Sequence, residues 1–354
     1  MRLGAATACA LPRRTAVCLA PLLFLAVLFA ACKSLHAQQP PVPLAGAAAA
    51  LPTVDLVLAH YNEPLAEVVA FVQRANASLP HARLARVFLY THHATTLNVS
   101  VVPHDWAVFT GVNVGRESHI YLEFIVRHWH DVSDFVWFSQ AVPDFYMDER
   151  LWPRLPLLTA RTGMLGLARI EPVSCNGIGQ GWYNPYFGSM LSQLWAISFH
   201  EFCHDRYWVA FFNGEFVVSA RRLRGQPRAL WAYLRDVVAQ PDGAWPHAAL
   251  EQEREKSTAT GPTFGHIMER AWSILFRCVP TKLQCCEADK PCEPDWCQCL
   301  DEPGDGEALA RLRARAAAVA NSSFFPLGLR FSAADGANPA LPPETSSWEQ
   351  QPGL

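Results

Sequence analysis

Residues 110–140 read TGVNVGRESHIYLEFIVRHWHDVSDFVWFSQ, and this stretch decides the fold that the sequence predicts. Glycines and an asparagine at its start indicate a tight loop, which the polar pair Arg116 and Glu117 follows. Apolar residues recur at helical spacing over 120–129, and the unbroken apolar run Phe135–Ser139 is typical of a buried strand. A polar cluster that opens a helix beside a buried strand indicates a ligand crevice of an α/β protein.

Two further strands are predicted before this stretch. Val54–Tyr61 and Leu84–Tyr90 are near-continuous apolar runs that lead into polar residues, as parallel strands buried on both faces do. A helix is predicted over 65–75, directly after Pro64, and a short third strand over 105–110. Strands that alternate with helices predict a doubly wound, Rossmann-like α/β fold with a mainly parallel sheet.

The second half of this domain is predicted to hold three helical segments and one strand. The helices are expected over 191–204, over 219–238 with a Gly-Gln-Pro interruption, and over 265–276. The strand is expected over 207–218, with a break at Asn213-Gly214. The α/β domain is therefore predicted to span 53–277.

Composition excludes two classes of protein. The chain is 51% hydrophobic and 17% charged, which is too apolar for a mostly disordered protein. Its formal net charge of −3 gives no basic excess for binding nucleic acid, so we expect no nucleic-acid partner.

The N-terminal residues are predicted to anchor the chain in a membrane. Residues 1–14 carry three arginines and are interpreted as a cytoplasmic tail, and 15–33 as a signal anchor with one transmembrane helix. A Pro/Ala-rich stalk, 34–52, follows. We expect a single-pass type II membrane protein of the Golgi or endoplasmic reticulum lumen. The alternative is a cleaved signal peptide and secretion.

Cysteine usage agrees with an oxidising compartment. Of 11 cysteines, eight lie beyond the leader, and six of these fall between positions 278 and 299. Disulfides are favoured over a zinc site there, and Cys175 and Cys203 are plausible partners in the main domain. The region 278–303 is therefore predicted to be a small disulfide-rich segment, and 304–354 a short helix and a disordered tail. Three Asn-x-Ser triplets support a glycoprotein, beginning at Asn76, Asn98 and Asn321.

The sequence His200-Glu201-Phe202-Cys203-His204 matches the H-E-x-x-H motif of zinc proteases. On a helix its two histidines share one face and can bind zinc, with the glutamate as general base. A third ligand is missing from the spacings that such enzymes use, because Ala210 and Arg224 stand there. A zinc metalloprotease is therefore kept only as a third alternative.

Polar residues follow the predicted strands, and parallel strands would bring them to one crevice. They are His60, Asn62, Glu63, Asn113, Arg116, Glu117, Gln140, Asp144 and Glu215. Arg116 can hold a diphosphate or a carboxylate through a forked pair of hydrogen bonds, and any of the carboxylates can act as a general base. The alternative for Arg116 and Glu117 is that they neutralise each other or neighbouring carboxylates within the fold and hold their loop rigid.

Several short segments together resemble a known family. They are LVLAHYNEPL, NVGRESHIYLEFIVRHW, FVWFSQAVPD, GEFVVSARRLRGQP, HIMERAWSILF and CEPDWCQC, within about residues 54–300. They are similar to a eukaryotic domain-of-unknown-function family marked by R-Y-N-E, N-V-G-R-E and F-L-Q-G motifs. That family in turn resembles glycosyltransferases of the GT-A type.

The resemblance implies a GT-A-like fold and a nucleotide site with named residues. The nucleotide-binding residues it implies are His60, Tyr61, Asn62, Glu63, Asn113, Gly115, Arg116, Glu117 and Gln140. Glu215 and Asp144 are the catalytic candidates. The chain departs from the pattern at His60, where the family has Arg, and at Ala141, where it has Gly.

The same resemblance places an Asp-x-Asp metal motif where this chain has Ser139-Gln140-Ala141. Mn²⁺ and Mg²⁺ need oxygen-rich ligand sets, so this departure disfavours a divalent metal there, and no metal ligand is predicted.

Three functions remain open at the level of sequence. The first is an enzyme that transfers a sugar from a nucleotide donor to a glycan or glycoprotein. The second is a catalytically inactive GT-A-like protein that binds glycans, and the third is the zinc protease. The partners implied by the first are a nucleotide-sugar, a glycan acceptor and a membrane.

Overall fold

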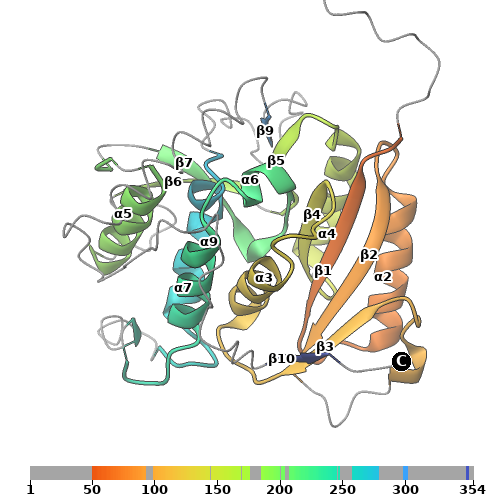
Figure 1. Cartoon of the computed structure of the whole chain (residues 1–354), viewed down its shortest axis with the longest axis horizontal. Coiled ribbons are helices and arrows are strands. Elements are labelled where there is room, and N and C mark those ends of the chain that lie inside the picture. Colours follow the sequence, from red (N-terminus) through yellow and green to blue (C-terminus); the bar gives the residue numbers. More distant parts are fainter. Residues whose placement is uncertain are drawn as a thin grey trace, which may run out of the picture. The chain divides into compact units, whose positions relative to one another are not determined.

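A mixed β-sheet organises the computed structural model of the chain (Figure 1). The structure describes residues 50–92, 99–143, 145–168, 170–175, 185–199, 201–203, 207–244, 246–247, 257–278, 298–301 and 348–350. Within these residues the main sheet has eight strands, in the order β10-β3-β2-β1-β4-β8-β5-β9. The strands are β1 Thr53–His60, β2 Arg83–Thr91, β3 Ala107–Gly111, β4 Phe135–Gln140, β5 Thr162–Gly166, β8 Phe216–Ser219, β9 Gln298–Leu300 and β10 Trp348–Gln350.

The sheet is mixed, with a parallel part and antiparallel pairs both inside it and at its edges. β1, β2, β3 and β4 pair in parallel, as predicted. β8 is antiparallel to both β4 and β5, so β5 runs in the same direction as β4. β9 and β10 pair antiparallel at the two edges. A separate two-stranded antiparallel sheet consists of β6 Ile170–Ser174 and β7 Tyr207–Phe211.

Helices cover both faces of the main sheet. The described helices are α2 Leu65–Ala77, α3 Arg116–Arg127, α4 Phe145–Arg154, α5 Pro185–Phe199, α6 Ala220–Leu223, α7 Arg228–Val238 and α9 Thr263–Leu275, with short 3-10 turns η1 Val99–Val101, η2 Leu155–Leu157 and η3 Phe212–Gly214.

Two adjacent residues of β4 show how the faces are covered, because neighbouring side chains of a strand point to opposite faces. The Trp137 ring lies 5.8 Å from Phe71 of α2, whereas the Phe138 ring lies 4.8 Å from Tyr121 of α3. Figure 1 shows α2 and α3 on either side of the strands.

The order of strands reverses beside β1. β2 and β3 lie on one side of β1, and β4 lies on the other. Such a switch point leaves a crevice at the carboxyl ends of the two central strands, where α/β proteins bind ligands. The predicted fold class is confirmed at this level: an α/β protein with a largely parallel sheet.

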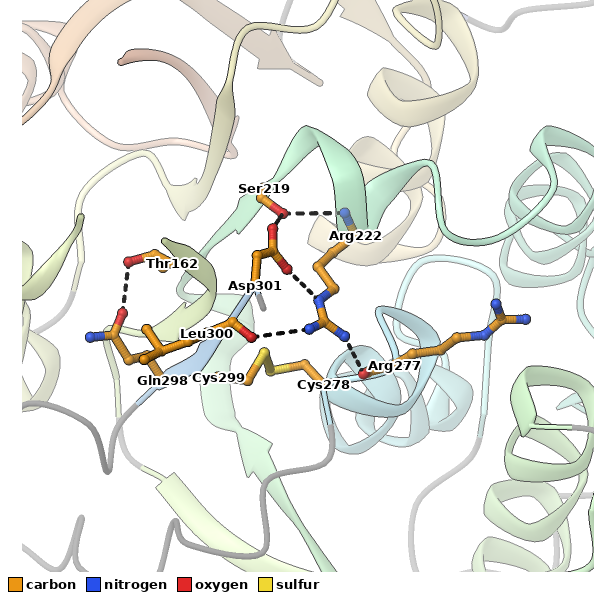
Figure 2. The surroundings of a disulfide bond; sticks show 9 residues. All are labelled: Thr162, Ser219, Arg222, Arg277, Cys278, Gln298, Cys299, Leu300 and Asp301. Carbon is orange, nitrogen blue, oxygen red and sulfur yellow. Dashed lines mark hydrogen bonds and ion pairs between the residues drawn. A yellow bond between two sulfur atoms is a disulfide. The ribbon is translucent and has the colours of Figure 1, made fainter. Parts of the chain in front are cut away.

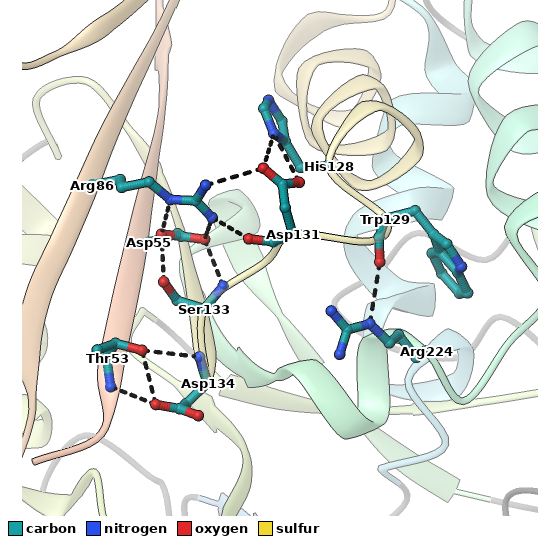
Figure 3. Close-up of polar contacts among 9 residues, drawn as sticks. All are labelled: Thr53, Asp55, Arg86, His128, Trp129, Asp131, Ser133, Asp134 and Arg224. Atoms are coloured by element: carbon teal, nitrogen blue, oxygen red, sulfur yellow. Dashed lines mark hydrogen bonds and ion pairs between the residues drawn. The ribbon is translucent and has the colours of Figure 1, made fainter. Parts of the chain in front are cut away.

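The amino ends of the central strands are joined by a buried carboxylate (Figure 3). Asp55 of β1 is fully buried and accepts hydrogen bonds from Arg86 Nε at 2.9 Å and Nη2 at 2.7 Å. It also accepts from the Ser133 backbone N–H at 2.8 Å and hydroxyl at 2.7 Å. Arg86 reaches onward to Asp131 at 3.1 Å. One carboxylate thus connects β1, β2 and the turn before β4.

A second polar network attaches the region after Cys278 to the sheet (Figure 2). Arg222 Nε donates to Asp301 Oδ1 at 2.7 Å, and Asp301 Oδ2 accepts from the Ser219 hydroxyl at 2.7 Å. Arg222 also donates to the carbonyl of Arg277 at 2.8 Å. A disulfide between Cys278 and Cys299 closes the same region.

The cysteine predictions are confirmed where the structure describes them. Cys175 pairs with Cys203, as predicted, and Cys278 with Cys299 provides a connection that the sequence left open. β9 lies within the region predicted to be a separate Cys-rich segment, yet it is a strand of the main sheet. β10 likewise lies in the predicted disordered tail and pairs with β3.

Two predicted elements have different bounds in the structure. The helix predicted over 191–204 is α5, which ends at Phe199. The strand predicted over 207–218 is divided at Asn213, which has a φ of 58°, so that β7 and β8 belong to different sheets. The predicted cytoplasmic tail, 1–14, and signal anchor, 15–33, lie outside the described residues. Among the residues that are described, no helix combines the length and apolar character needed to cross a membrane.

We expect Asp55→Ala to lower the free energy of unfolding by about 3 kcal/mol or more, because it removes a buried partner on which four hydrogen bonds converge. Urea denaturation measures the loss. Asp236→Ala is the control, since that carboxylate is 61% exposed in its pair with Arg235 and should cost less than about 0.5 kcal/mol. Equal losses in the two variants would contradict the role of Asp55.

Candidate functional site

Two predicted site residues are in contact at the carboxyl end of β4. Gln140 ends β4, and Glu215 directly precedes β8, which is antiparallel to β4. The Gln140 backbone N–H donates to Glu215 Oε1 at 2.6 Å, across 75 positions of sequence. The Glu215 side chain is fully buried. This carboxylate therefore holds the end of β4 in place.

The loop after β1 is fixed by its own side chains. His60 is buried, and its Nδ1 lies 2.8 Å from Thr91 Oγ1 and its Nε2 2.9 Å from the Glu63 carbonyl. The Glu63 carboxylate accepts the backbone N–H groups of Tyr61 at 2.8 Å and Asn62 at 3.0 Å. His60 and Glu63 thus shape this loop, while the Tyr61 side chain remains half exposed beside the crevice.

The loop before α3 has an unusual backbone. Gly115 and Arg116 are both left-handed, with φ values of 68° and 53°. Only glycine fits at 115, because an added Cβ would lie 2.5 Å from His119 Cβ. The Gly115 N–H donates to the Ala259 carbonyl at 2.8 Å, which fixes the turn. Burial lowers the pKa of His119 to about 4, so the imidazole next to Gly115 is neutral.

Arg116 lies exposed at the start of α3. Its side chain is exposed, and within the described residues it makes no ion pair, so the alternative in which Arg116 and Glu117 neutralise each other as a contact pair is not what the structure shows. α3 begins without a side-chain cap hydrogen bond from its N-cap residue, Gly115. An arginine with a left-handed backbone conformation is strained, and residues with such strain are found more often at functional sites.

Glu117 lies in a cluster that the sequence did not predict. An added Cβ on Gly214, which has a φ of 65°, would lie 3.5 Å from Glu117 Cγ and 2.9 Å from Tyr121 Cε2. Burial raises the pKa of Glu117 to about 7, and the negative charge of Glu269 adds to this effect. Glu117 is therefore a carboxyl group that changes charge near neutral pH.

Tyr121 forms the inner wall of this cluster. It is fully buried, and its hydroxyl has no hydrogen-bond partner among the described residues. Burial raises its pKa well above the ordinary value, and the charges of Glu215, Glu117 and Glu269 add to the effect. The hydroxyl is therefore neutral.

The sequence did not assign Tyr121, Gly214 or Glu269 to the site, because each belongs to a pattern of its own segment. Tyr121 stands one helical turn after Glu117, and Glu269 one turn after Gly265, whose added Cβ would lie 3.8 Å from Arg116 Cδ. Gly214 belongs to the predicted break in the strand. Only the packing of α9 against α3 shows that they meet.

Two predicted residues remain. Asn113 lies in the loop before α3 and is partly buried. Asp144 lies outside the described residues. In the part of the chain that is described, no three His, Cys, Asp or Glu side chains gather closely enough to hold a metal ion.

The part of the zinc-protease motif that the structure describes is not helical. Glu201, Phe202 and Cys203 lie beyond the end of α5 and are not helical. Cys203 is in a disulfide, and the Phe202 side chain is 74% exposed. The two histidines of the motif lie outside the described residues. The prediction that the helix continues to 204 and carries this motif is therefore wrong for residues 201–203.

We expect Gly214→Ala to destabilise the protein more than Gly243→Ala. Both glycines are left-handed, but an added Cβ at Gly243 meets nothing within 4 Å, whereas at Gly214 it overlaps Tyr121. The control should lose about 1 kcal/mol for backbone strain, and Gly214→Ala roughly 1–3 kcal/mol more for overpacking. Chemical denaturation measures both. Equal losses would show that Gly214 does not pack against the cluster.

A second prediction concerns the pH dependence of stability. Because the folded pKa of Glu117 is about 7 and the ordinary value is 4.5, the folded state binds more protons between these values. Its contribution to stability is therefore present below about pH 4.5 and is lost as pH rises through 7. We expect Glu117→Gln to remove this decline in urea titrations at pH 5 to 8, whereas Glu67→Gln on the exposed face of α2 should keep it. A Glu117→Gln curve parallel to wild type would contradict the assignment.

Comparison of the chain with protein-family models, with curated proteins and with solved structures gave no match. What the protein does must therefore be inferred from its own residues and their arrangement.

Proposed function

We propose that this chain is a GT-A-like glycosyltransferase that binds a nucleotide-sugar at the carboxyl ends of β1 and β4. It would transfer the sugar to a glycan or glycoprotein acceptor. The observation that carries the proposal is the state of Arg116: exposed, left-handed, and without an ion pair among the described residues, at the uncapped start of α3.

The chemistry of a diphosphate fits these groups. A guanidinium binds phosphate oxygens in a forked geometry, and helix N–H groups favour the same negative charge. When a sugar leaves a nucleoside diphosphate, negative charge grows on the diphosphate, and a fixed cation stabilises it. Arg116 would therefore support both binding and departure of the leaving group.

Exposed apolar side chains beside the crevice support a nucleoside. Tyr61 follows β1 and is 50% exposed, and Val112 follows β3 and is 56% exposed. Bases commonly stack on exposed aromatic rings. We assign Tyr61 to the base, with Asn62 and Asn113 at the edge of the same site.

In this proposal Glu215 is a positioning residue, although the sequence favoured it as catalytic. It is fully buried, and its Oε1 accepts the Gln140 N–H, so it fixes the end of β4 under the ligand. Glu117, which is only partly buried, is the carboxyl of the cluster that a ligand can approach.

One observation favours the second candidate, a GT-A-like protein that binds a glycan without transferring a sugar. Gln140 stands where the resemblance places a metal-binding aspartate, and an amide is a weaker ligand for Mn²⁺ or Mg²⁺ than a carboxylate. This protein would keep the crevice and lose the transfer step.

We further propose that the domain works in the lumen of the Golgi or endoplasmic reticulum, with the N-terminal segment in the membrane. Two disulfides, Cys175–Cys203 and Cys278–Cys299, support an oxidising compartment. Asn76, the first glycosylation acceptor, is exposed in the last turn of α2.

The test is a binding screen of the full-length protein in detergent against UDP, GDP and CDP, with and without Mn²⁺. We expect at least one nucleotide to raise the melting temperature, and Arg116→Ala to weaken its binding about tenfold or more, because a charged hydrogen-bond pair is lost. Arg221→Ala is the control, an exposed arginine at the opposite end of β8. Absence of any shift with the wild-type protein would overturn the proposal. Binding without sugar release from a nucleotide-sugar would favour the second candidate.

A further inference from the structure

The Asn76-Ala77-Ser78 triplet lies where α2 ends. Asn76 and Ala77 are the last two helical residues, and Ser78 follows with a φ of −97° and a ψ of 8°. The Ser78 N–H donates to the Ala75 carbonyl at 3.1 Å, which closes the last turn. Helix ends fray more readily than helix interiors, so the triplet can open without disturbing the rest of α2.

The reactive groups of this triplet are accessible. The residues by which α2 packs into the core are Val68, Phe71, Val72 and Ala75. Asn76 and Ala77 lie outside that face and are exposed, and Ser78 is half-buried. Within the described part of the chain, the Asn76 amide and the Ser78 hydroxyl make no hydrogen bond. Neither group therefore has to leave a partner before it can react.

We propose that Asn76 carries an N-linked oligosaccharide. The inference rests on the lumenal location proposed above and not on the nucleotide site. The triplet meets the sequence requirement of an acceptor, because its middle residue, Ala77, is not proline. In the transfer, Asn76 Nδ2 forms a bond to the first carbon of an oligosaccharide carried on a lipid diphosphate. The bond from that carbon to the diphosphate oxygen breaks, the amide loses a proton, and the lipid diphosphate leaves with the electron pair.

The surroundings of Asn76 accommodate a large hydrophilic group. Gln73, one helical turn earlier, is exposed, and so are Pro80 and His81 beyond the end of the helix. A glycan on Asn76 can therefore extend into solvent without displacing a packed side chain.

The direction of α2 places this glycan away from the proposed nucleotide site. α2 begins after the carboxyl end of β1 and ends before the amino end of β2, which is parallel to β1. Its 13 residues span roughly 20 Å at the helical rise. Asn76 thus lies towards the amino ends of the strands, and the carboxyl ends of β1 and β4 remain uncovered.

The test expresses the full-length protein in a eukaryotic cell and measures the mass lost on treatment with peptide N-glycosidase. Asn98→Gln and Asn321→Gln together remove the other two acceptors, which lie outside the described residues. We expect this double variant to keep one glycan, which peptide mass spectrometry assigns to Asn76. Adding Asn76→Gln or Ser78→Ala should abolish the glycan, whereas Ser78→Thr, the conservative control, should keep it. All variants should melt together once they are deglycosylated, because the replaced side chains make no hydrogen bond in the described part of the chain.

The outcomes separate this inference from the proposed function. A double variant without a glycan, beside a wild type that carries one, overturns the inference and leaves the lumenal location standing. A wild type without any glycan overturns both. A glycan on Asn76 in a protein that binds no nucleotide supports the inference and overturns the proposed nucleotide site. Where a nucleotide binds, its affinity should be equal before and after deglycosylation, and weaker binding by the glycosylated protein contradicts the placement of the glycan.

Discussion

The Asp55 carboxylate is the constraint on which the central sheet depends. It lies fully buried at the amino end of β1, where four hydrogen bonds from Arg86 and Ser133 converge on it. A buried charge is tolerated only when its partners hold it with good geometry, so β2 and the turn before β4 must take fixed places relative to β1. Once the amino ends are aligned, the carboxyl ends are aligned as well.

The two ends of the strands carry opposite kinds of structure. The amino end holds the hydrogen-bond network of Asp55, whereas left-handed backbone conformations lie near the carboxyl end. Two left-handed pairs, Gly115-Arg116 and Asn213-Gly214, stand on either side of Glu117 and Tyr121. Neither pair is needed to continue a strand or helix. Strain of this kind persists only where the surrounding fold enforces it.

Sequence patterns predicted the parts of the fold that depend on local order. The apolar runs of β1, β2 and β4 and the helical spacing of α3 follow from burial alone, so their strand ends were predicted as site positions. The direction of β8 depends on long-range pairing, and it decides that Glu215 binds Gln140. Glu269 enters the cluster through the packing of α9 on α3, which no local pattern records. The helix predicted to 204 stops at Phe199, before Cys203, which is tied to Cys175.

β10 closes the outer edge of the sheet by pairing with residues 109–111 of β3. An edge strand without such cover exposes a row of free N–H and C=O groups, which readily pair with another chain. The covered residues directly precede the loop that leads to Arg116. Proteolytic loss of residues 348–350 would therefore do two things at once. It would create a template for self-association, and it would remove a neighbour from the loop that carries the exposed arginine.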